Sequence, residues 1–136
     1  MNPGRQRLAY AAATIAIVGA GLICRSPALG LPWPLAKYAG SVLWGAMVYA
    51  GMRTLRPRSP LLWSAIAACA IAVGVECLRL YHQPALDAFR ATLAGQLLLG
   101  RLFSLWNIVA YGIGIGGGAF CDFQTLRKRR PGIMRN

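Results

Sequence analysis

The sequence predicts an all-α integral membrane protein with four transmembrane helices and a short interfacial or re-entrant helix between the third and the fourth. Three observations support this prediction. Of the 136 residues, 57% are hydrophobic and only 13% are charged, whereas soluble domains carry about 25% charged residues. Four apolar stretches reach the roughly 17–25 residues that a bilayer span needs. Lys and Arg gather at the ends of these stretches, where orientation signals belong.

The four apolar stretches cover about residues 8–24, 35–52, 61–80 and 102–120. The first follows Arg5 and Arg7, an arrangement that signal peptides share. Ile23, however, is too large a residue for the position before Cys24 in a lipoprotein cleavage site, so we interpret this stretch as a helix. The length allows one domain, and we expect a single membrane domain over residues 1–136.

The distribution of the 15 Lys and Arg residues predicts the orientation. Ten lie before the first span, between the second and third spans, or after the fourth, and five lie on the other side. The richer side is expected to be cytoplasmic. This places both termini, and a basic tail over residues 122–136, on the cytoplasmic side of a bacterial inner membrane. The formal charge of +12 could also suggest nucleic-acid binding, but the positions of the charges favour orientation, and no nucleic acid is expected as a partner.

The segment between the third and fourth stretches is semi-polar. Leu86, Phe89 and Leu93 recur at helical spacing, with Asp87 and Arg90 on another part of the surface. This pattern predicts an amphipathic helix over residues 84–94 on the outer leaflet. Glycines at 95 and 100 are expected to break or bend it, and the pattern leaves open whether residues 81–101 are interfacial or re-entrant.

Small and polar residues within the spans predict helix packing. Glycine lets helix backbones approach closely in lipid, and Asn usually hydrogen-bonds a neighbouring helix. Residues four apart share a helix face. The candidate packing residues are Gly40, Gly45, Gly112, Gly116, Asn107 and Tyr111.

Glu76 is the only acid within a predicted span, and an intramembrane ionisable residue is a candidate functional residue. With Arg79, Arg90 and Arg101 it forms a candidate anionic-headgroup or interface site near the outer surface, since Arg offers a planar fork of donors. Two alternatives stay open: a local pair of Glu76 with Arg79, and arginines that face bulk lipid. No metal-ligand spacing, cofactor motif or nucleophile motif occurs, so no metal, cofactor or catalytic residue is expected.

Three segments carry a resemblance to a known family: KYAGSVLWGAMVYAGMRTLRP (residues 37–57), VECLRLYHQPALDAFRATLAGQLLLGRLF (residues 75–103) and NIVAYGIG (residues 107–114). They resemble the bacterial membrane family called domain of unknown function 2809, itself distantly similar to VanZ-like proteins linked to glycopeptide resistance. The chain departs from the family pattern at four positions. Asp is usual where this chain has Ser41 and Asn107, Gln where it has Arg79, and Trp where it has Ala85.

Three functions are compatible with these observations. The first is a non-catalytic accessory or structural subunit of a larger membrane assembly, with other membrane-protein subunits as partners. The second is an outer-leaflet protein or enzyme that binds a membrane lipid or polyprenyl phosphate. The third is a transporter component. Small size, glycine-rich faces and the absence of a nucleophile motif favour the first.

Overall fold

Every regular element in the described part of the chain is a helix. The computed structural model describes residues 2–99 and 103–128. The elements in chain order are α1 (Pro3–Cys24), the 3-10 helix η1 (Pro27–Leu29), α2 (Trp33–Leu55), α3 (Leu61–Leu78), α4 (Pro84–Ala91), α5 (Leu93–Leu98) and α6 (Leu105–Lys128).

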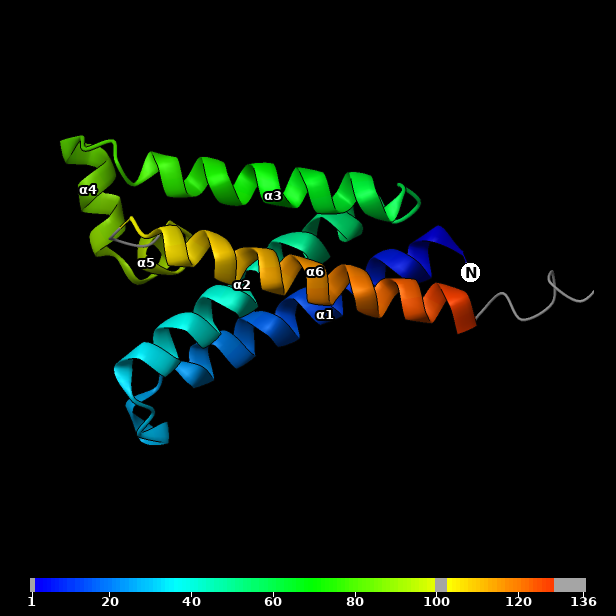
Figure 1. Cartoon of the computed structure of the whole chain (residues 1–136), viewed down its shortest axis with the longest axis horizontal. Coiled ribbons are helices and arrows are strands. Elements are labelled where there is room, and N and C mark those ends of the chain that lie inside the picture. Colours follow the sequence, from blue (N-terminus) through cyan, green and yellow to red (C-terminus); the bar gives the residue numbers. More distant parts are fainter. Residues whose placement is uncertain (1, 100–102, 129–136) are drawn as a thin grey trace, which may run out of the picture.

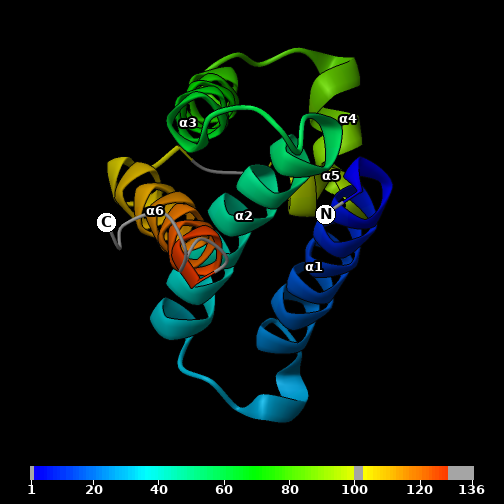
Figure 2. The same cartoon turned by 90° about the vertical axis from the view of Figure 1, so that its right-hand side faces the viewer.

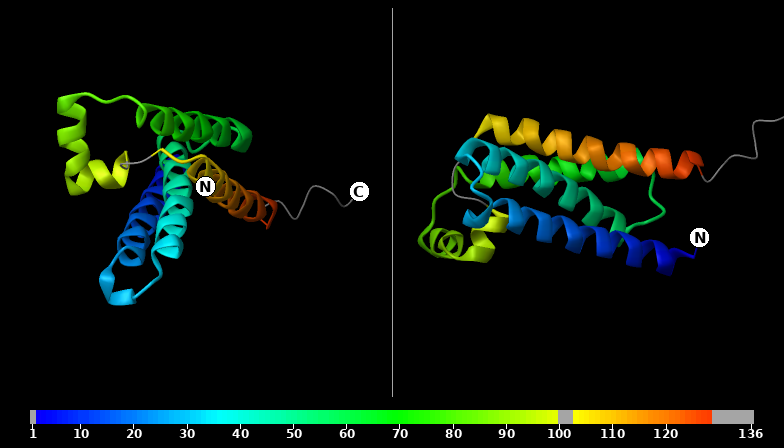
Figure 3. Two further views of the ribbon diagram at one scale, coloured as in Figure 1. Left: turned by 60° about the vertical axis from the view of Figure 1, so that its left-hand side comes forward. Right: turned by 90° about the horizontal axis from the view of Figure 1, so that it is seen from below.

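The four long helices run side by side, and α4 and α5 close one end of the bundle (Figure 1). Helix α2 is central, because it packs against α1, α3 and α6, and α6 also packs against α3 (Figure 2). The first residues of α1 and the last of α6 lie at the same end (Figure 3). We call this the termini end and the opposite one the α4 end.

Proline and side-chain caps explain where several helices begin. Proline suits the first turn, where the backbone N–H has no intrahelical partner. It occupies this turn in α1, α2 and α4, and Pro60 directly precedes α3. In α1, the Asn2 side chain accepts a hydrogen bond from the Gly4 N–H at 3.2 Å, as an N-cap residue does.

The helices differ from the expected spans mainly at their ends. Helix α1 begins at Pro3 and α6 continues to Lys128, so the first part of the predicted tail 122–136 is helical, and residues 129–136 lie outside the described residues. The amphipathic segment ends earlier than expected, because the chain breaks at Thr92, where ψ is 158°. The Thr92 hydroxyl then accepts from the Gly95 N–H at 3.1 Å and caps α5.

Gly95 therefore lies inside α5 instead of interrupting the helix. A Cβ at this position would overlap the carbonyl carbon and oxygen of Phe89, so glycine is what allows α5 to fold back against α4.

Helix α3 has small and polar residues inside and large apolar residues outside. Its buried positions recur every four residues and are Ser64, Ala68, Ala72 and Glu76. The exposed positions include Leu62, Trp63, Ile66 and Ile71. Soluble proteins rarely expose large contiguous apolar patches, whereas helices packed in lipid place small residues at their interfaces.

Two helices, α1 and α3, are long and apolar enough to cross a membrane by length and composition. Helices α2 and α6, with 23 and 24 residues, are longer than α3. They are more polar because they supply the buried polar residues of the bundle centre, which include Ser41, Tyr49 and Arg53 from α2 and Asn107 and Tyr111 from α6. Their lower apolarity therefore follows from their central position.

Glycines bring α2 and α6 into backbone contact. A Cβ at Gly45 would overlap the backbone of Tyr111, and a Cβ at Gly114 would overlap the Val42 carbonyl. Gly112 and Gly116, which are also four residues apart on α6, do not contact α2, since a Cβ at either position meets nothing within 4 Å. Of the two G-x-x-x-G spacings in α6, Gly114 and Gly118 face α2, while Gly112 and Gly116 face outward.

We predict that Gly114→Ala destabilises the folded protein by about 1–3 kcal/mol, because the added methyl group forces α2 and α6 apart. Gly112→Ala is the matched control on the same helix and should be neutral or stabilising by up to about 1 kcal/mol, since Ala is the better helix former. Thermal unfolding in detergent measures both. Equal unfolding temperatures would contradict the close α2–α6 contact.

Candidate functional site

The Glu76 carboxylate is completely buried and accepts hydrogen bonds from four donors. Its Oε2 accepts from Arg79 Nη1 at 2.5 Å and from the Tyr111 hydroxyl at 3.1 Å. Its Oε1 accepts from the Ser104 backbone N–H at 2.7 Å and from Asn107 Nδ2 at 3.2 Å. The side chain is 0% exposed. A buried charge is tolerable when it is paired and hydrogen-bonded, and both conditions hold for Glu76.

Arg79 follows the last residue of α3 and is also buried. Besides Glu76, its guanidinium donates to the Tyr111 hydroxyl at 2.8 Å and to the Leu99 carbonyl oxygen. The Tyr111 ring packs against Trp44 of α2, with ring centroids 4.7 Å apart. The ion pair thus joins the end of α3 to α6 and to the residue that follows α5.

Ser41 of α2 completes the cluster. Its hydroxyl lies 3.4 Å from Asn107 Oδ1 and 3.1 Å from the Lys37 carbonyl oxygen, so Asn107 connects α2 to the carboxylate. We call Ser41, Glu76, Arg79, Asn107 and Tyr111 the Glu76 cluster. Its members come from α2, α3 and α6 and from the residue after α3, and they meet near the α4 end.

Arg90 caps a helix end instead of joining the Glu76 cluster. It is buried on α4, and its guanidinium donates to the carbonyl oxygens of Leu78 at 2.6 Å and Tyr81 at 3.0 Å. These oxygens lie at and beyond the last turn of α3, where carbonyls lack intrahelical partners. Arg90 also pairs with Asp87 at 2.8 Å.

Asp87 is the exposed member of this second group. Desolvation acts to raise the pKa of its carboxyl, but hydrogen bonds from Arg90 and His82 outweigh that effect, and the pKa lies below its ordinary value. A lowered pKa means that the pair stabilises the fold at pH values above the ordinary Asp pKa, near 4. The stabilisation is lost as the pH falls through the lowered pKa.

The structure brings together part of the candidate site that the sequence suggests. Glu76 and Arg79 are paired, and Asn107 and Tyr111 both reach the same carboxylate. Arg90 binds carbonyl oxygens of the last residue of α3 and of the α3–α4 connection. Arg101 lies outside the described residues. Arg79 and Arg90 are 8% and 4% exposed, and the hydrogen bonds described above direct both towards protein groups.

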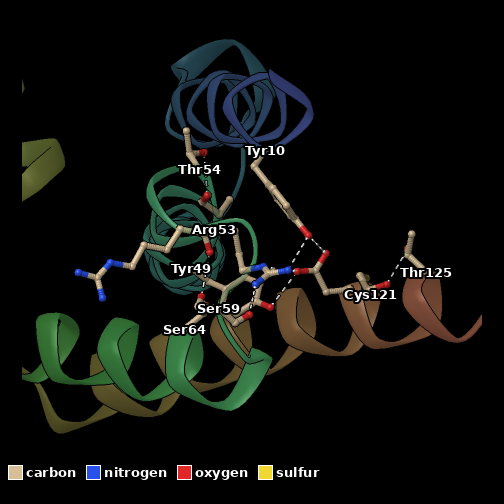
Figure 4. A network of polar contacts seen from close by, with 11 residues as sticks. Tyr10, Tyr49, Arg53, Thr54, Ser59, Ser64, Cys121 and Thr125 are labelled. Carbon is tan, nitrogen blue, oxygen red and sulfur yellow. Dashed lines mark hydrogen bonds and ion pairs between the residues drawn. The ribbon is translucent and has the colours of Figure 1, made fainter. Parts of the chain in front are cut away.

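A second buried cluster, near the termini end, is absent from the sequence-based prediction. Arg53 of α2 is 3% exposed and its Nε donates to Asp122 of α6 at 2.9 Å. The hydroxyls of Tyr10 and Tyr49 donate to the same carboxylate at 2.8 and 3.0 Å. Figure 4 shows Tyr10, from α1, pointing towards the Arg53 side chain. We call Tyr10, Tyr49, Arg53 and Asp122 the Asp122 cluster.

The Asp122 cluster also holds the connection between α2 and α3. Arg53 Nη1 donates to the Ser59 carbonyl oxygen at 2.7 Å, and the Ser59 and Ser64 hydroxyls lie 2.8 Å apart (Figure 4). The cluster therefore links all four long helices. Its one signal in the sequence is that Asp122 is among only three acids in the chain.

All three acids of the chain pair with an arginine: Glu76 with Arg79, Asp87 with Arg90, and Asp122 with Arg53. Two of these pairs are buried among helices that are distant in sequence. Both buried clusters hold opposite charges in contact and join several helices. This arrangement is best suited to fixing the positions of the helices relative to one another.

We predict that alanine at the three acids destabilises the protein in the order Glu76, Asp122, Asp87. Removing Glu76 leaves a buried arginine without its ion-pair partner, which typically lowers the free energy of unfolding by about 3–5 kcal/mol. Asp122 is slightly more exposed, and Asp87 is at the surface. Thermal and denaturant unfolding in lipid nanodiscs measure the order. If Asp87→Ala had the largest effect, the assignment of the two buried clusters as helix anchors would be wrong.

We further predict that the double variant Glu76→Gln with Arg79→Gln is more stable than Glu76→Gln alone. The double variant leaves no unpaired buried charge, and unpaired charge is the main cause of the loss. A double-mutant cycle with denaturant unfolding measures the coupling between the two residues. Additive losses would show that the pair does not act as a unit.

Comparison with known proteins places the chain in a family. The family model described as a protein of unknown function, DUF2809, matches residues 31–115, which is more than half of the 136 residues. This range contains the whole Glu76 cluster, whereas Tyr10 and Asp122 lie outside it. No solved structure matches the chain, and the more distant resemblance to VanZ-like proteins stays a prediction. The chain belongs to the family of proteins of unknown function called DUF2809.

Proposed function

We propose that the protein crosses the bacterial inner membrane four times, with both termini cytoplasmic, and acts as a non-catalytic accessory subunit of a membrane-protein assembly. The lengths of the helices support the four spans. Helices of 18 to 24 residues are about 27–36 Å long, and the hydrocarbon core is about 30 Å thick. The shared position of the described termini (Figure 3) agrees with an even number of spans.

The placement of polar residues inside the bundle and apolar residues outside supports membrane placement for α2 and α6 as well. Their buried polar residues point into the Glu76 and Asp122 clusters, so these residues are not exposed to lipid. Hydroxyl groups elsewhere in the helices are also satisfied internally: Thr14 and Thr54 donate to carbonyl oxygens four residues earlier. In a bilayer, polar groups need such internal partners.

The single observation that carries the accessory role is the outward-facing stripe of α6. It consists of Leu105, Val109, Gly112, Ile113, Gly116 and Phe120, all exposed. Each glycine costs a helix about 1 kcal/mol relative to alanine, and at Gly112 and Gly116 no contact within the described chain requires it. Small residues at this spacing let a second helix approach closely. We infer that a helix of another membrane protein packs on this stripe.

We predict that Gly112→Leu with Gly116→Leu abolishes copurification of the partner subunit from the native membrane, weakening association at least about tenfold, or 1.4 kcal/mol. The added side chains enter open space, so the fold should persist. Gly74→Leu on α3 is the matched control, because Gly74 is also exposed and has nothing within 4 Å. It should keep the partner.

The readout is mild solubilisation followed by mass spectrometry of the intact complex. A partner at fixed stoichiometry that the double variant loses would support the accessory role. A monomer from the native membrane, or equal retention by the double variant and the control, would overturn it. Association with a second copy of the chain alone would reassign the stripe to self-assembly.

A further inference from the structure

An apolar groove lies between α1, α2 and α5, and Trp44, which packs against Tyr111 of the Glu76 cluster, forms part of its wall. Its volume is about 250 Å³. The lining includes Ile17 and Gly21 from α1, Leu43 and Met47 from α2, and Ala94 and Leu98 from α5. Cavities lined by apolar side chains exclude water and take up hydrocarbon. The volume is below the roughly 300–1,000 Å³ of most small-molecule sites, so the groove suits one hydrocarbon chain.

One end of the groove is cationic. Arg25, the residue that follows α1, lines the groove and lies against Gly40, where a Cβ would be 3.1 Å from the arginine Nε. Arg25 is exposed, and its side chain has no hydrogen bond or ion pair in residues 2–99 and 103–128. It therefore differs from Arg53, Arg79 and Arg90, whose guanidinium groups donate to protein acceptors. A guanidinium with free donors at a groove mouth suits phosphate.

The surroundings of Arg25 place this end of the groove at a membrane interface. Lys37, three residues before Gly40 on α2, lies over the rings of Trp33 and Tyr38 at 5.0 and 5.4 Å. Tryptophan and tyrosine gather at the level of lipid headgroups. The acids of the α4 end, Glu76 and Asp87, are paired with other arginines, so the cationic character of the mouth is retained.

The length of the groove matches one leaflet. From Arg25 to Ile17, eight residues of α1 rise about 12 Å. Half of the hydrocarbon core is about 15 Å thick. A lipid whose phosphate lies at Arg25 can therefore run one acyl chain along the groove towards the middle of the bilayer.

We propose that this groove is a binding site for an anionic phospholipid of the surrounding bilayer, with one acyl chain between α1, α2 and α5 and the phosphate on Arg25. The charge of Arg25 selects an anionic headgroup over a zwitterionic one. The site rests on the proposed membrane placement and is independent of the accessory role, because it lies on different helices from the α6 stripe.

The test is native mass spectrometry of the full-length protein in mild detergent, titrated with phosphatidylglycerol or phosphatidylcholine. Wild type should retain phosphatidylglycerol about tenfold more tightly than phosphatidylcholine. Arg25→Gln should abolish this preference and keep chain binding, whereas Arg56→Gln, at an exposed arginine of the α2–α3 connection, should preserve it. Equal retention of the two lipids by wild type would overturn the headgroup assignment.

A second pair of variants tests the groove itself. Gly21→Leu fills it, and Gly19→Leu is the control on the same helix; a Cβ at either glycine meets nothing within 4 Å, so both should fold. Gly21→Leu should bind both lipids about tenfold more weakly than wild type, and Gly19→Leu should bind them as wild type does. Equal binding by the two variants would show that the retained lipid sits elsewhere. The Gly112→Leu with Gly116→Leu variant should keep the lipid preference, which separates this site from the partner interface.

Discussion

A carboxylate with no solvent contact determines how three of the long helices meet at one end of the protein. Glu76 accepts from Arg79, Asn107, Tyr111 and the Ser104 N–H. No water is needed to satisfy it, because each of its two oxygens has two protein donors. The register of α3 against α6 follows, since a shift of either helix by one turn would separate Glu76 from Asn107 and Tyr111. Helix α2 enters the same arrangement through Ser41 and Trp44.

The Asp122 cluster plays the corresponding part at the termini end. Arg53 and Asp122 hold α2 to α6, and Tyr10 adds α1. Between the two clusters, the α2–α6 contact is made by glycines and small residues, which bring the backbones together without polar groups. The bundle is thus fastened near both ends by hydrogen-bonded ion pairs and packed closely in the middle. Large apolar side chains cover the outside, where they suit lipid.

Three of the four positions at which the chain departs from the family pattern meet in the Glu76 cluster. Ser41 and Asn107 contact one another, and Asn107 and Arg79 both contact Glu76. The resemblance implies acids at Ser41 and Asn107, and neighbouring buried carboxylates repel one another. In this chain, two neutral side chains and an added cation leave one carboxylate with one guanidinium. This self-neutralised arrangement agrees with an orienting role for the cluster.

The sequence by itself determined features that depend on local pattern. The lengths of the apolar stretches located the four long helices, the spacing of Leu86 and Phe89 located α4, and the four-residue spacing of Asn107 and Tyr111 placed both on one face. These features arise from helix periodicity, which needs only neighbouring residues. Only the tertiary structure decided that Arg53 belongs to Asp122, because the two are 69 residues apart. It also decided that Gly114 faces α2 while Gly112 faces outward, since both glycines occur in equivalent spacings and only the position of the neighbouring helix distinguishes them.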